Sequence, residues 1–347
     1  MKDKFTVTQI KTDVFRFESI LDTQKQVEIY LKNDPCTEEK KLLVKTFKNN
    51  FEIEIPNINY RPYFLVKEKN REYIVAERTL PVNGMNNFRD MGGYETFDGK
   101  AVKWGLLFRS DHIHNASESG VKYLKKLNIN TIIDYRSQDE ISKYPNKIIS
   151  DAVRTYVLDP DAHTAELSAQ FTSSKDNEDI NLVNKIIEQK EKGTLVNRYD
   201  MVMEQYYNFV NKEKSKEAYA NMLKIAADPF SPSIVQHCRG GKDRTGFGAM
   251  LLLGALGVKK EYLVFDYMLT HTNRIERNEK KMEGYRKITK DVDVLNYLYS
   301  LIETRAEFIE ASIESIEKQY GTIKDYVVKE LGISEEIIKT LKELYLE

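Results

Sequence analysis

Short runs of alternating apolar and polar residues fill the first 80 positions of the chain. Asn, Asp, Pro and charged residues separate these runs, and every second side chain of a strand lies on the same face. The alternation predicts seven strands, at residues 5–8, 14–17, 27–31, 42–45, 51–55, 63–66 and 73–76. Regularly spaced short strands are typical of a small antiparallel sandwich. We therefore expect residues 1–80 to form an all-β, sandwich-like N-terminal domain that serves as a scaffold or in recognition.

The pattern changes beyond residues 81–84, where the sequence Pro-Val-Asn-Gly marks a junction. Short runs with adjacent β-branched residues at 130–134 and 233–235 predict buried strands, and residues 199–210 carry apolar side chains on one helical face. Strands that alternate with helices predict an α/β domain, with a central, largely parallel sheet flanked by helices. We assign residues 81–347 to this domain.

Local signals refine three stretches of the second domain. Ser137 and Glu140 match the capping box that starts a helix. Residues 165–195 are polar and charged, so they are either a lid over the functional site or an ordinary surface insertion. Residues 274–281 are dense in charge, so they are either a solvated helix face or a source of cations near the site.

Composition excludes several functional classes. The 347 residues carry a formal net charge of −1, so no global charge steers the chain to nucleic acid or to a membrane surface. Cys36 and Cys238 are the two cysteines, too few for a disulfide framework and typical of a reducing compartment. The first residues contain no apolar signal region, and no apolar run has transmembrane length. We expect a cytoplasmic protein, although a secreted protein whose signal peptide had been removed would have the same features.

The strongest chemical signal is the loop between the strand at residues 233–235 and an apolar helix expected at residues 247–256. It combines one cysteine with two adjacent glycines, a lysine and two arginines. Glycines allow backbone N–H groups to turn inward, and the N-terminus of the next helix adds its dipole, so the loop predicts an anion site. Helix N-termini and nearby cations also stabilise a thiolate. Cys238 is therefore a candidate nucleophile.

The residues around Cys238 refine this interpretation. Arg244 follows it after five intervening residues, a spacing that lets the planar guanidinium return over the sulfur and bind two phosphate oxygens. His237 is expected to orient the loop and to favour the ionised sulfur. Thr245 is expected to donate a hydrogen bond to the thiolate.

Two other interpretations of the loop are less favoured. A buried structural cysteine beside an ordinary turn would require the cysteine, the glycine pair, the arginine and the helix start to coincide by accident. A Walker-type nucleotide loop needs Gly with four residues between it and Gly-Lys, and then Ser or Thr. Gln236 and Asp243 occupy those two places, which excludes that class.

The loop sequence resembles that of a known family. Residues 237–246 read His-Cys-Arg-Gly-Gly-Lys-Asp-Arg-Thr-Gly and resemble the signature of the cysteine-dependent protein tyrosine phosphatases. They are most similar to a bacterial branch with Gly-Lys-Asp-Arg in the loop, like tyrosine phosphatase family 3, whose members are often described as dual-specificity and phosphoinositide phosphatases. Residues 87–94, 105–110 and 132–136 are similar to segments near the start of that catalytic domain. The resemblance extends from about residue 82 to the C-terminus.

The resemblance implies hydrolysis of phosphomonoesters through a phosphocysteine intermediate. Cys238 would be the nucleophile, and Arg244 with the N–H groups of the loop would hold the phosphate, without a metal or other cofactor. The phosphate-binding residues of the loop would be Arg239, Gly240, Gly241 and Lys242.

Three functions fit this loop. The leading substrate is a phosphorylated protein, phosphotyrosine first and dual specificity as an extension, with inorganic phosphate as a product. Lys242 adds a second cation to the loop, which suits highly anionic substrates, so a phosphoinositide is the alternative substrate. A non-catalytic phosphate-binding module is less favoured, because Cys238 and Arg244 are both present. No nucleic-acid partner and no transmembrane segment are expected.

The general acid is open among three aspartates. Asp243 is the first candidate because it lies inside the loop, although its alternative role is a structural ion pair. The better-known tyrosine phosphatases use an aspartate on a separate Trp-Pro-Asp loop. Asp159 and Asp161 flank Pro160 in a comparable place, so either is a rival for the role.

Two further pairs of residues have alternative roles. Arg89 and Asp90 either support the phosphate-binding loop or pair with each other. His112 and His114 are spaced like metal ligands, but no cysteine or carboxylate cluster completes such a site. A surface or capping role is therefore expected for these histidines.

Overall fold

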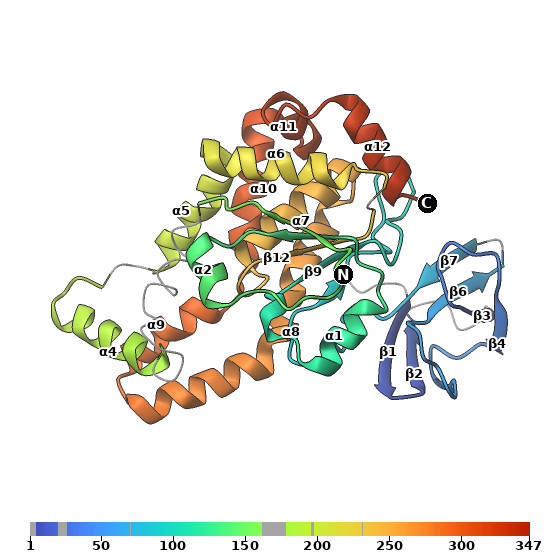
Figure 1. The fold of residues 1–347 in the computed structure, drawn as a ribbon, viewed down its shortest axis with the longest axis horizontal. Coiled ribbons are helices and arrows are strands. Elements are labelled where there is room, and N and C mark those ends of the chain that lie inside the picture. The colour runs from blue at the N-terminus through green and yellow to red at the C-terminus, as the bar shows by residue number, and fades with distance from the viewer. Residues whose placement is uncertain (1–4, 20–25, 70, 162–177, 196–197, 231) are drawn as a thin grey trace.

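Two antiparallel sheets form one end of the molecule, at the right in Figure 1. The computed structural model describes residues 5–19, 26–69, 71–161, 178–195, 198–230 and 232–347. The sheets have the strand orders β1-β2-β5 and β4-β3-β6-β7. The strands are β1 (Phe5–Lys11), β2 (Val14–Ser19), β3 (Val27–Lys32), β4 (Lys41–Thr46), β5 (Asn50–Glu54), β6 (Tyr63–Glu68) and β7 (Arg71–Val75). The seven strands predicted from the alternation are confirmed.

Apolar side chains from both sheets fill the space between them. Phe17 of β2, Ile29 of β3 and Phe64 of β6 are fully buried and belong to one apolar cluster. The ring centroids of Phe17 and Phe64 lie 4.9 Å apart in an edge-to-face contact. The sandwich-like architecture is therefore confirmed, with its core built from the inward-facing residues of alternating strands.

A five-stranded sheet forms the centre of the second region, in the order β11-β10-β12-β9-β8. Its strands are β8 (Arg89–Asp90), β9 (Leu107–Ser110), β10 (Thr131–Asp134), β11 (Arg154–Val157) and β12 (Ile234–His237). All neighbours are parallel except β8, which is antiparallel to β9. His237 is in register with Ser110 of β9 and with Asp134 of β10. Three carboxyl ends therefore meet at one edge, where ligands bind in sheets of this kind.

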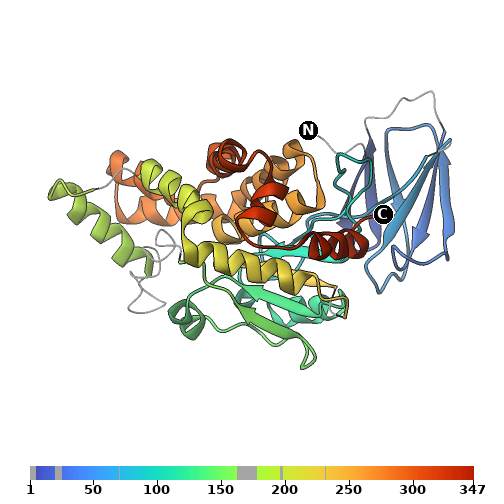
Figure 2. The same ribbon diagram turned by 90° about the horizontal axis from the view of Figure 1, so that it is seen from above.

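Helices cover both faces of this sheet (Figures 1 and 2). Leu107 and Ile234 belong to an apolar cluster with residues of α5 to α8 and α10 to α12, whereas their neighbours Phe108 and Val235, which point to the opposite face, belong to a cluster with Leu124 of α1. The helices are α1 (Glu118–Lys125), α2 (Gln138–Lys143), α4 (Glu178–Glu191), α5 (Arg198–Asn211), α6 (Glu213–Ala226), α7 (Asp243–Leu256), α8 (Lys260–Ile288), α9 (Val292–Ile302), α10 (Ala306–Tyr320), α11 (Ile323–Lys329) and α12 (Glu335–Tyr345). The α/β architecture with a largely parallel sheet is confirmed.

Helix α7 follows the cysteine-containing loop directly. It begins at Asp243, earlier than the predicted residue 247, because the polar residues of the loop's end already form its first turn. A carboxylate in that turn is favoured by the helix dipole. Every residue of α7 after Asp243 is buried, and Gly257, whose φ is 88°, is the C-cap residue that follows the helix.

Helix α8 is one continuous element of 29 residues. Its first half packs into the main core through residues such as Leu263. Its second half contributes Tyr285 to a separate apolar cluster with Leu182 of α4 and Leu298 of α9. Figure 1 shows α4, α9 and this end of α8 extending together away from the sheet.

Polar and aromatic contacts join the β-sandwich to the α/β region. Arg61 Nη1 lies 2.6 Å from Oδ2 of Asp90, and both side chains are buried. Trp104 Nε1 donates a hydrogen bond to the carbonyl oxygen of Ile74 in β7 at 3.0 Å. The domain boundary at residue 80 stays a prediction. In the part of the chain that the structure describes, no helix has the length and apolar character needed to cross a membrane.

Candidate active site

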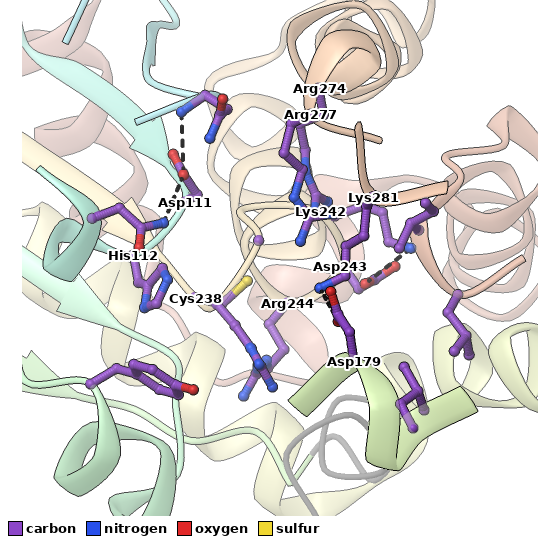
Figure 3. A pocket seen from close by; sticks show the side chains of 18 of the residues that line it. Asp111, His112, Asp179, Cys238, Lys242, Asp243, Arg244, Arg274, Arg277 and Lys281 are labelled. Carbon is purple, nitrogen blue, oxygen red and sulfur yellow. Dashed lines mark hydrogen bonds and ion pairs between the residues drawn. The ribbon is translucent and has the colours of Figure 1, made fainter. Parts of the chain in front are cut away.

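The segment of residues 238–244, called the Cys238 loop below, follows the carboxyl end of β12 and includes the first two residues of α7. Cys238 is 3% exposed and lines a pocket of about 340 Å³. Figure 3 shows its sulfur facing the interior of this pocket. The other loop residues that line the pocket are Arg239, Gly240, Lys242, Asp243 and Arg244. The structure therefore brings three of the four predicted phosphate-binding residues, Arg239, Gly240 and Lys242, to the pocket that Cys238 lines, and the lining does not include Gly241.

Close approach requires glycine at position 241. Gly241 has a φ of 64°, and a Cβ there would lie 2.3 Å from the carbonyl oxygen of Ser110 at the end of β9. A Cβ on Gly240 would lie 3.0 Å from the guanidinium of Arg274, which would have to shift slightly. The loop can pass this close to the end of β9 only because Gly241 lacks a side chain.

Arg244 is locked in place by Glu140 of α2. Its Nη1 and Nη2 donate to the two carboxylate oxygens of Glu140 at 2.6 and 3.0 Å, and Nη1 also donates to the carbonyl oxygen of Tyr135 at 3.1 Å. Burial opposes the charge of Arg244, but Glu140 outweighs it and raises the pKa of Arg244. Burial likewise opposes the charge of Glu140, and Arg244 lowers the pKa of that carboxyl. The guanidinium is therefore charged and fixed beside the cysteine.

Sequence reasoning missed this role of Glu140. The predicted capping box is formed, because Ser137 N donates to Oε2 of Glu140 at 3.1 Å and the Ser137 hydroxyl accepts from Glu140 N. The same carboxylate binds Arg244. The capping box was the signal in the sequence that drew attention to Glu140. A capping role alone accounts for this residue, so it gives no reason to expect a pair with Arg244.

His237 is buried between the sheet and the loop. Its Nδ1 lies 3.3 Å from the carbonyl oxygen of Cys238, and its Nε2 lies 3.1 Å from Nδ2 of Asn146. Burial lowers the pKa of His237 despite the nearby Asp134. The Nε2 of a neutral ring accepts the hydrogen bond from Asn146, so the ring proton lies on Nδ1. Nδ1 therefore donates a hydrogen bond to the Cys238 carbonyl oxygen. His237 thus contacts the loop without bringing a positive charge to the sulfur, and its role in orienting the loop stays a prediction.

The hydrogen bond expected from Thr245 to the thiolate is not formed. Its side chain is fully buried, and its hydroxyl has no hydrogen-bond partner within the described structure. Because α7 already begins at Asp243, Thr245 lies inside the helix and not at the end of the loop.

Among the three candidate acids, Asp243 lines the pocket. Its Oδ1 accepts a hydrogen bond from the Tyr206 hydroxyl at 2.9 Å, and its Oδ2 lies 3.7 Å from Nζ of Lys242. The lining residues do not include Asp159 or Asp161. Asp159 instead accepts a hydrogen bond from the backbone N–H of Asp161 at 3.0 Å.

The pocket is strongly basic. Three acidic residues, Asp111, Asp179 and Asp243, line it, but so do seven basic ones: Arg198, Arg239, Lys242, Arg244, Arg274, Arg277 and Lys281. The solvated-face interpretation of residues 274–281 is therefore wrong for the three that line the pocket, because α8 turns them toward the Cys238 loop (Figure 3). Burial lowers the pKa of Arg277 to about 10, which leaves it charged at neutral pH. The arrangement favours a ligand with more than one negative charge.

Helix α4 forms part of the pocket wall. Asp179 and Leu182 line the pocket, and Asp179 pairs with Lys281 of α8 at 2.9 Å. Residues 165–177 of the predicted lid lie outside the described residues. The lid over residues 165–195 stays a prediction.

The two histidines of the His-x-His pattern differ in environment. His114 is half-buried, and its Nδ1 lies 2.8 Å from the carbonyl oxygen of Pro145. His112 lines the pocket, so a surface role is wrong for it. It does stand at the N-cap position of the short 3-10 helix Ile113–Asn115, although its side chain makes no capping hydrogen bond. Burial lowers the pKa of His112 to about 2, with Arg136 adding to the effect. No group of three or more His, Cys, Asp or Glu side chains suited to a metal occurs among the described residues.

Arg89 and Asp90 do not pair with each other. Asp90 binds Arg61 of the β-sandwich, and Arg89 binds Asp266 of α8. Arg89 reaches the Cys238 loop indirectly. It binds Asn87, whose amide donates to two carbonyl groups of the loop, and it shares Asp266 with Arg109, which also donates to the loop. The prediction of a supporting role therefore holds for Arg89 in this indirect sense.

Comparison with known proteins identifies the class. A sequence profile of the tyrosine phosphatase family matches residues 80–347, which include the central sheet, the Cys238 loop and all the helices named above. The chain belongs to the tyrosine phosphatase family. It is a protein-tyrosine-phosphatase-like hydrolase of phosphoric monoesters.

Two curated relatives agree with this family assignment. A candidate tyrosine-protein phosphatase of Cupriavidus necator is 24% identical over 254 residues, which cover 73% of this chain and 84% of that protein. The triple specificity protein phosphatase PtpB of Mycobacterium tuberculosis is 25% identical over 291 residues, which cover 78% of this chain and 100% of that protein.

Proposed function

We propose that this phosphatase acts through a phosphocysteine formed on Cys238, with phosphotyrosine as its first substrate. The observation that carries the proposal is the geometry of the pocket. A buried cysteine lies at its wall, the loop backbone curls around the cysteine, and Arg244 is held beside it by Glu140. This arrangement combines a nucleophile with fixed donors for a phosphoryl group.

The first step transfers the phosphoryl group to the enzyme. The Cys238 thiolate attacks phosphorus in line with the ester oxygen, so the S–P bond forms as the P–O bond breaks. Arg244 and the N–H groups of the loop bind the three equatorial oxygens, where negative charge is concentrated in the transition state. Because Arg244 is already fixed in the free protein, little reorganisation is needed at that moment.

Asp243 is our candidate for proton transfer. As an acid it protonates the departing ester oxygen, and as a carboxylate it then takes a proton from the water that attacks the phosphocysteine. The second step releases inorganic phosphate and restores the thiolate. The position of Asp243 in the pocket lining and the hydrogen bond that it accepts from Tyr206 support the assignment. Asp159 and Asp161 are the alternatives.

A phosphoinositide is the second candidate substrate. The basic residues beyond the Cys238 loop, among them Arg274 and Arg277, favour a ligand with further phosphate groups. The relative from Mycobacterium tuberculosis is named a triple specificity protein phosphatase, which also supports a broad substrate range. We place phosphotyrosine first, because its single phosphate dianion is enough to occupy the proposed anion site of the Cys238 loop.

Side-by-side turnover of the substrate classes tests this proposal. A phosphotyrosine peptide, the matched phosphoserine peptide and short-chain phosphoinositides are assayed by phosphate release, with Cys238→Ser as the blank. We expect the highest kcat/KM for the phosphotyrosine peptide and no release by Cys238→Ser. A higher kcat/KM for a phosphoinositide than for the phosphotyrosine peptide would make a phosphoinositide the preferred substrate. Residual turnover by Cys238→Ser would contradict the mechanism.

A further inference from the structure

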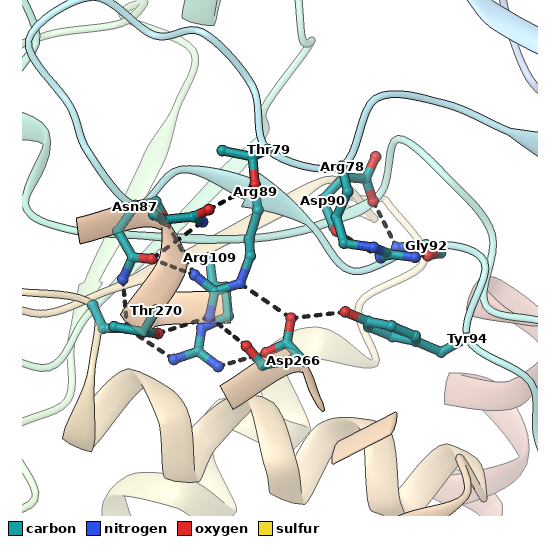
Figure 4. A network of polar contacts seen from close by, with 12 residues as sticks. Arg78, Thr79, Asn87, Arg89, Asp90, Gly92, Tyr94, Arg109, Asp266 and Thr270 are labelled. Carbon is teal, nitrogen blue, oxygen red and sulfur yellow. Dashed lines mark hydrogen bonds and ion pairs between the residues drawn. The ribbon is translucent and has the colours of Figure 1, made fainter. Parts of the chain in front are cut away.

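Four buried residues from three segments form one polar network next to the Cys238 loop (Figure 4). They are Asn87, Arg89 of β8, Arg109 of β9 and Asp266 of α8. Arg89 Nε donates to Oδ1 of Asp266 at 3.1 Å, and Arg109 Nη1 donates to Oδ2 at 2.6 Å. Arg89 Nη1 also donates to Oδ1 of Asn87 at 2.5 Å. Each of the four side chains is therefore oriented by at least one of the others.

Two members of the network bind the backbone of the loop. Asn87 Nδ2 donates to the carbonyl oxygens of Gly240 and Gly241, at 3.1 Å each. Arg109 Nη2 donates to the carbonyl oxygens of Gly241 at 2.8 Å and Lys242 at 3.3 Å. Three successive carbonyl groups are thus fixed by side chains from outside the loop.

The direction of these carbonyl groups determines the direction of the N–H groups that follow them. A trans peptide unit is planar, and its C=O and N–H bonds point in opposite directions. Fixing the carbonyl groups of Gly240 and Gly241 toward the network turns the N–H groups of Gly241 and Lys242 away from it. Neither N–H group has a hydrogen-bond acceptor among the described residues. Both are therefore donors for an anion that the loop encloses.

Charge holds the network together and adds to the attraction for an anion. Burial alone would raise the pKa of Asp266, but Arg89 and Arg109 outweigh it and lower that pKa to about 2. Burial, together with the neighbouring Arg109, lowers the pKa of Arg89 to about 10, still well above neutral pH. Two positive charges and one negative charge are therefore buried next to the loop, and their sum favours a bound anion.

We propose that Asn87, Arg89, Arg109 and Asp266 are positioning residues that hold the Cys238 loop in its anion-binding conformation. Asn87 and Arg109 act directly on the loop carbonyl groups, while Arg89 and Asp266 hold these two in place. The inference rests on the proposed function, because it takes the loop to be the phosphate site. None of the four residues needs to touch the substrate.

The test uses near-isosteric variants in the Cys238→Ser protein, with tungstate as the phosphate analogue and titration calorimetry as the readout. Asn87→Leu removes both amide donors with little change of shape, and Arg109→Met removes the guanidinium. Thr270→Val is the matched control. The Thr270 hydroxyl accepts a hydrogen bond from Arg89 at 3.0 Å but, within the described structure, makes none to the loop.

We expect Asn87→Leu and Arg109→Met to weaken tungstate binding by about tenfold or more, since each leaves carbonyl groups of the loop unpaired. Thr270→Val should change the affinity by less than about threefold. Arg109→Lys, which keeps the charge with fewer donors, replaces Arg109→Met if that protein does not fold. The inference would be overturned if Thr270→Val lost as much tungstate affinity as the other variants. It would also be overturned if Asn87→Leu and the Arg109 variant bound tungstate as tightly as the Cys238→Ser parent. A parent protein that binds no tungstate would overturn the proposed phosphate site itself, and the inference with it.

Discussion

Glu140 links the start of a helix to the chemistry of the pocket. Its carboxylate completes the capping box of α2 and receives two hydrogen bonds from Arg244, which lies 104 residues further along the chain. A charge-assisted pair with two parallel bonds fixes the plane of the guanidinium as well as its position. At the scale of the residue, therefore, contacts within the protein fix the guanidinium of Arg244 at the pocket.

Asp243 is the residue whose proposed role is most open to test. Asp243→Asn, Asp159→Asn and Asp161→Asn are each assayed with an alkyl phosphate, a poor leaving group, and with an activated aryl phosphate, a good one. A good leaving group departs with little protonation, so the true acid variant fails mainly on the alkyl phosphate, by roughly 10²–10⁴-fold. It also loses the basic limb of the pH–rate profile. We expect this behaviour from Asp243→Asn.

The other two variants serve as the controls in this assay. If Asp243→Asn slows both substrates equally while Asp159→Asn or Asp161→Asn shows the selective loss, the acid lies on the segment after β11. Asp243 would then be a structural partner of Tyr206 and Lys242.

At the scale of the element, α8 connects two parts of the site. Asp266 in its first half belongs to the network that binds the Cys238 loop, and Arg274 and Arg277, further along the helix, line the pocket. Arg274 is 9% exposed, and its guanidinium faces Gly240 of the loop. Burial lowers the pKa of Arg274, with Asp111 and Asp243 opposing the effect. A buried cation in this place is costly to desolvate, so an anionic ligand compensates it well.

Arg274→Met should therefore act on substrates with a second anionic group. We expect kcat/KM for a substrate with two phosphate groups to fall by about tenfold or more, because a charge-assisted contact is lost. The loss for a simple aryl phosphate should be smaller. Arg286→Met, at an exposed position of the same helix, is the matched control. Equal losses for both substrates would place Arg274 in the support of the loop and not in substrate selection.

The sequence predicted the features that depend on neighbouring residues. The period of two in the first 80 residues was enough to predict seven strands, and the motif of residues 237–246 was enough to predict the family. It did not predict that Arg89 binds Asp266, 177 residues away, because local patterns carry no information on such partners. The charged run on α8 was ambiguous for the same reason, since only the packing of α8 decides which of its cations reach the pocket.

At the scale of the whole molecule, the β-sandwich is joined to the region around the active site. Asp90, which binds Arg61, directly follows Arg89 of the network in β8. Burial opposes the charge of Arg61, but Asp90 outweighs it and raises the pKa of Arg61. Removing one partner of a buried ion pair leaves an uncompensated charge, which costs about 3–5 kcal/mol.

Arg61→Met should therefore lower the free energy of unfolding by about 3–5 kcal/mol in denaturant titrations. Arg16→Met is the matched control, because Arg16 pairs with Glu52 on the surface of the same sandwich, with both side chains more than 40% exposed. An exposed pair contributes about 0–1 kcal/mol. An equal, small effect of the two substitutions would show that the two regions are not coupled through Asp90.

The covalent intermediate tests the central claim most directly. The active protein is mixed with an activated aryl phosphate, quenched in acid within the first turnover, digested, and analysed by mass spectrometry. Asp243→Asn, which is expected to slow hydrolysis of the intermediate, is treated in parallel to increase its amount. We predict one added phosphoryl group on the peptide that contains Cys238, and none on the same peptide of Cys238→Ser. An unmodified Cys238 peptide from a protein that is turning over, or a Cys238→Ser protein with undiminished turnover, would contradict the mechanism.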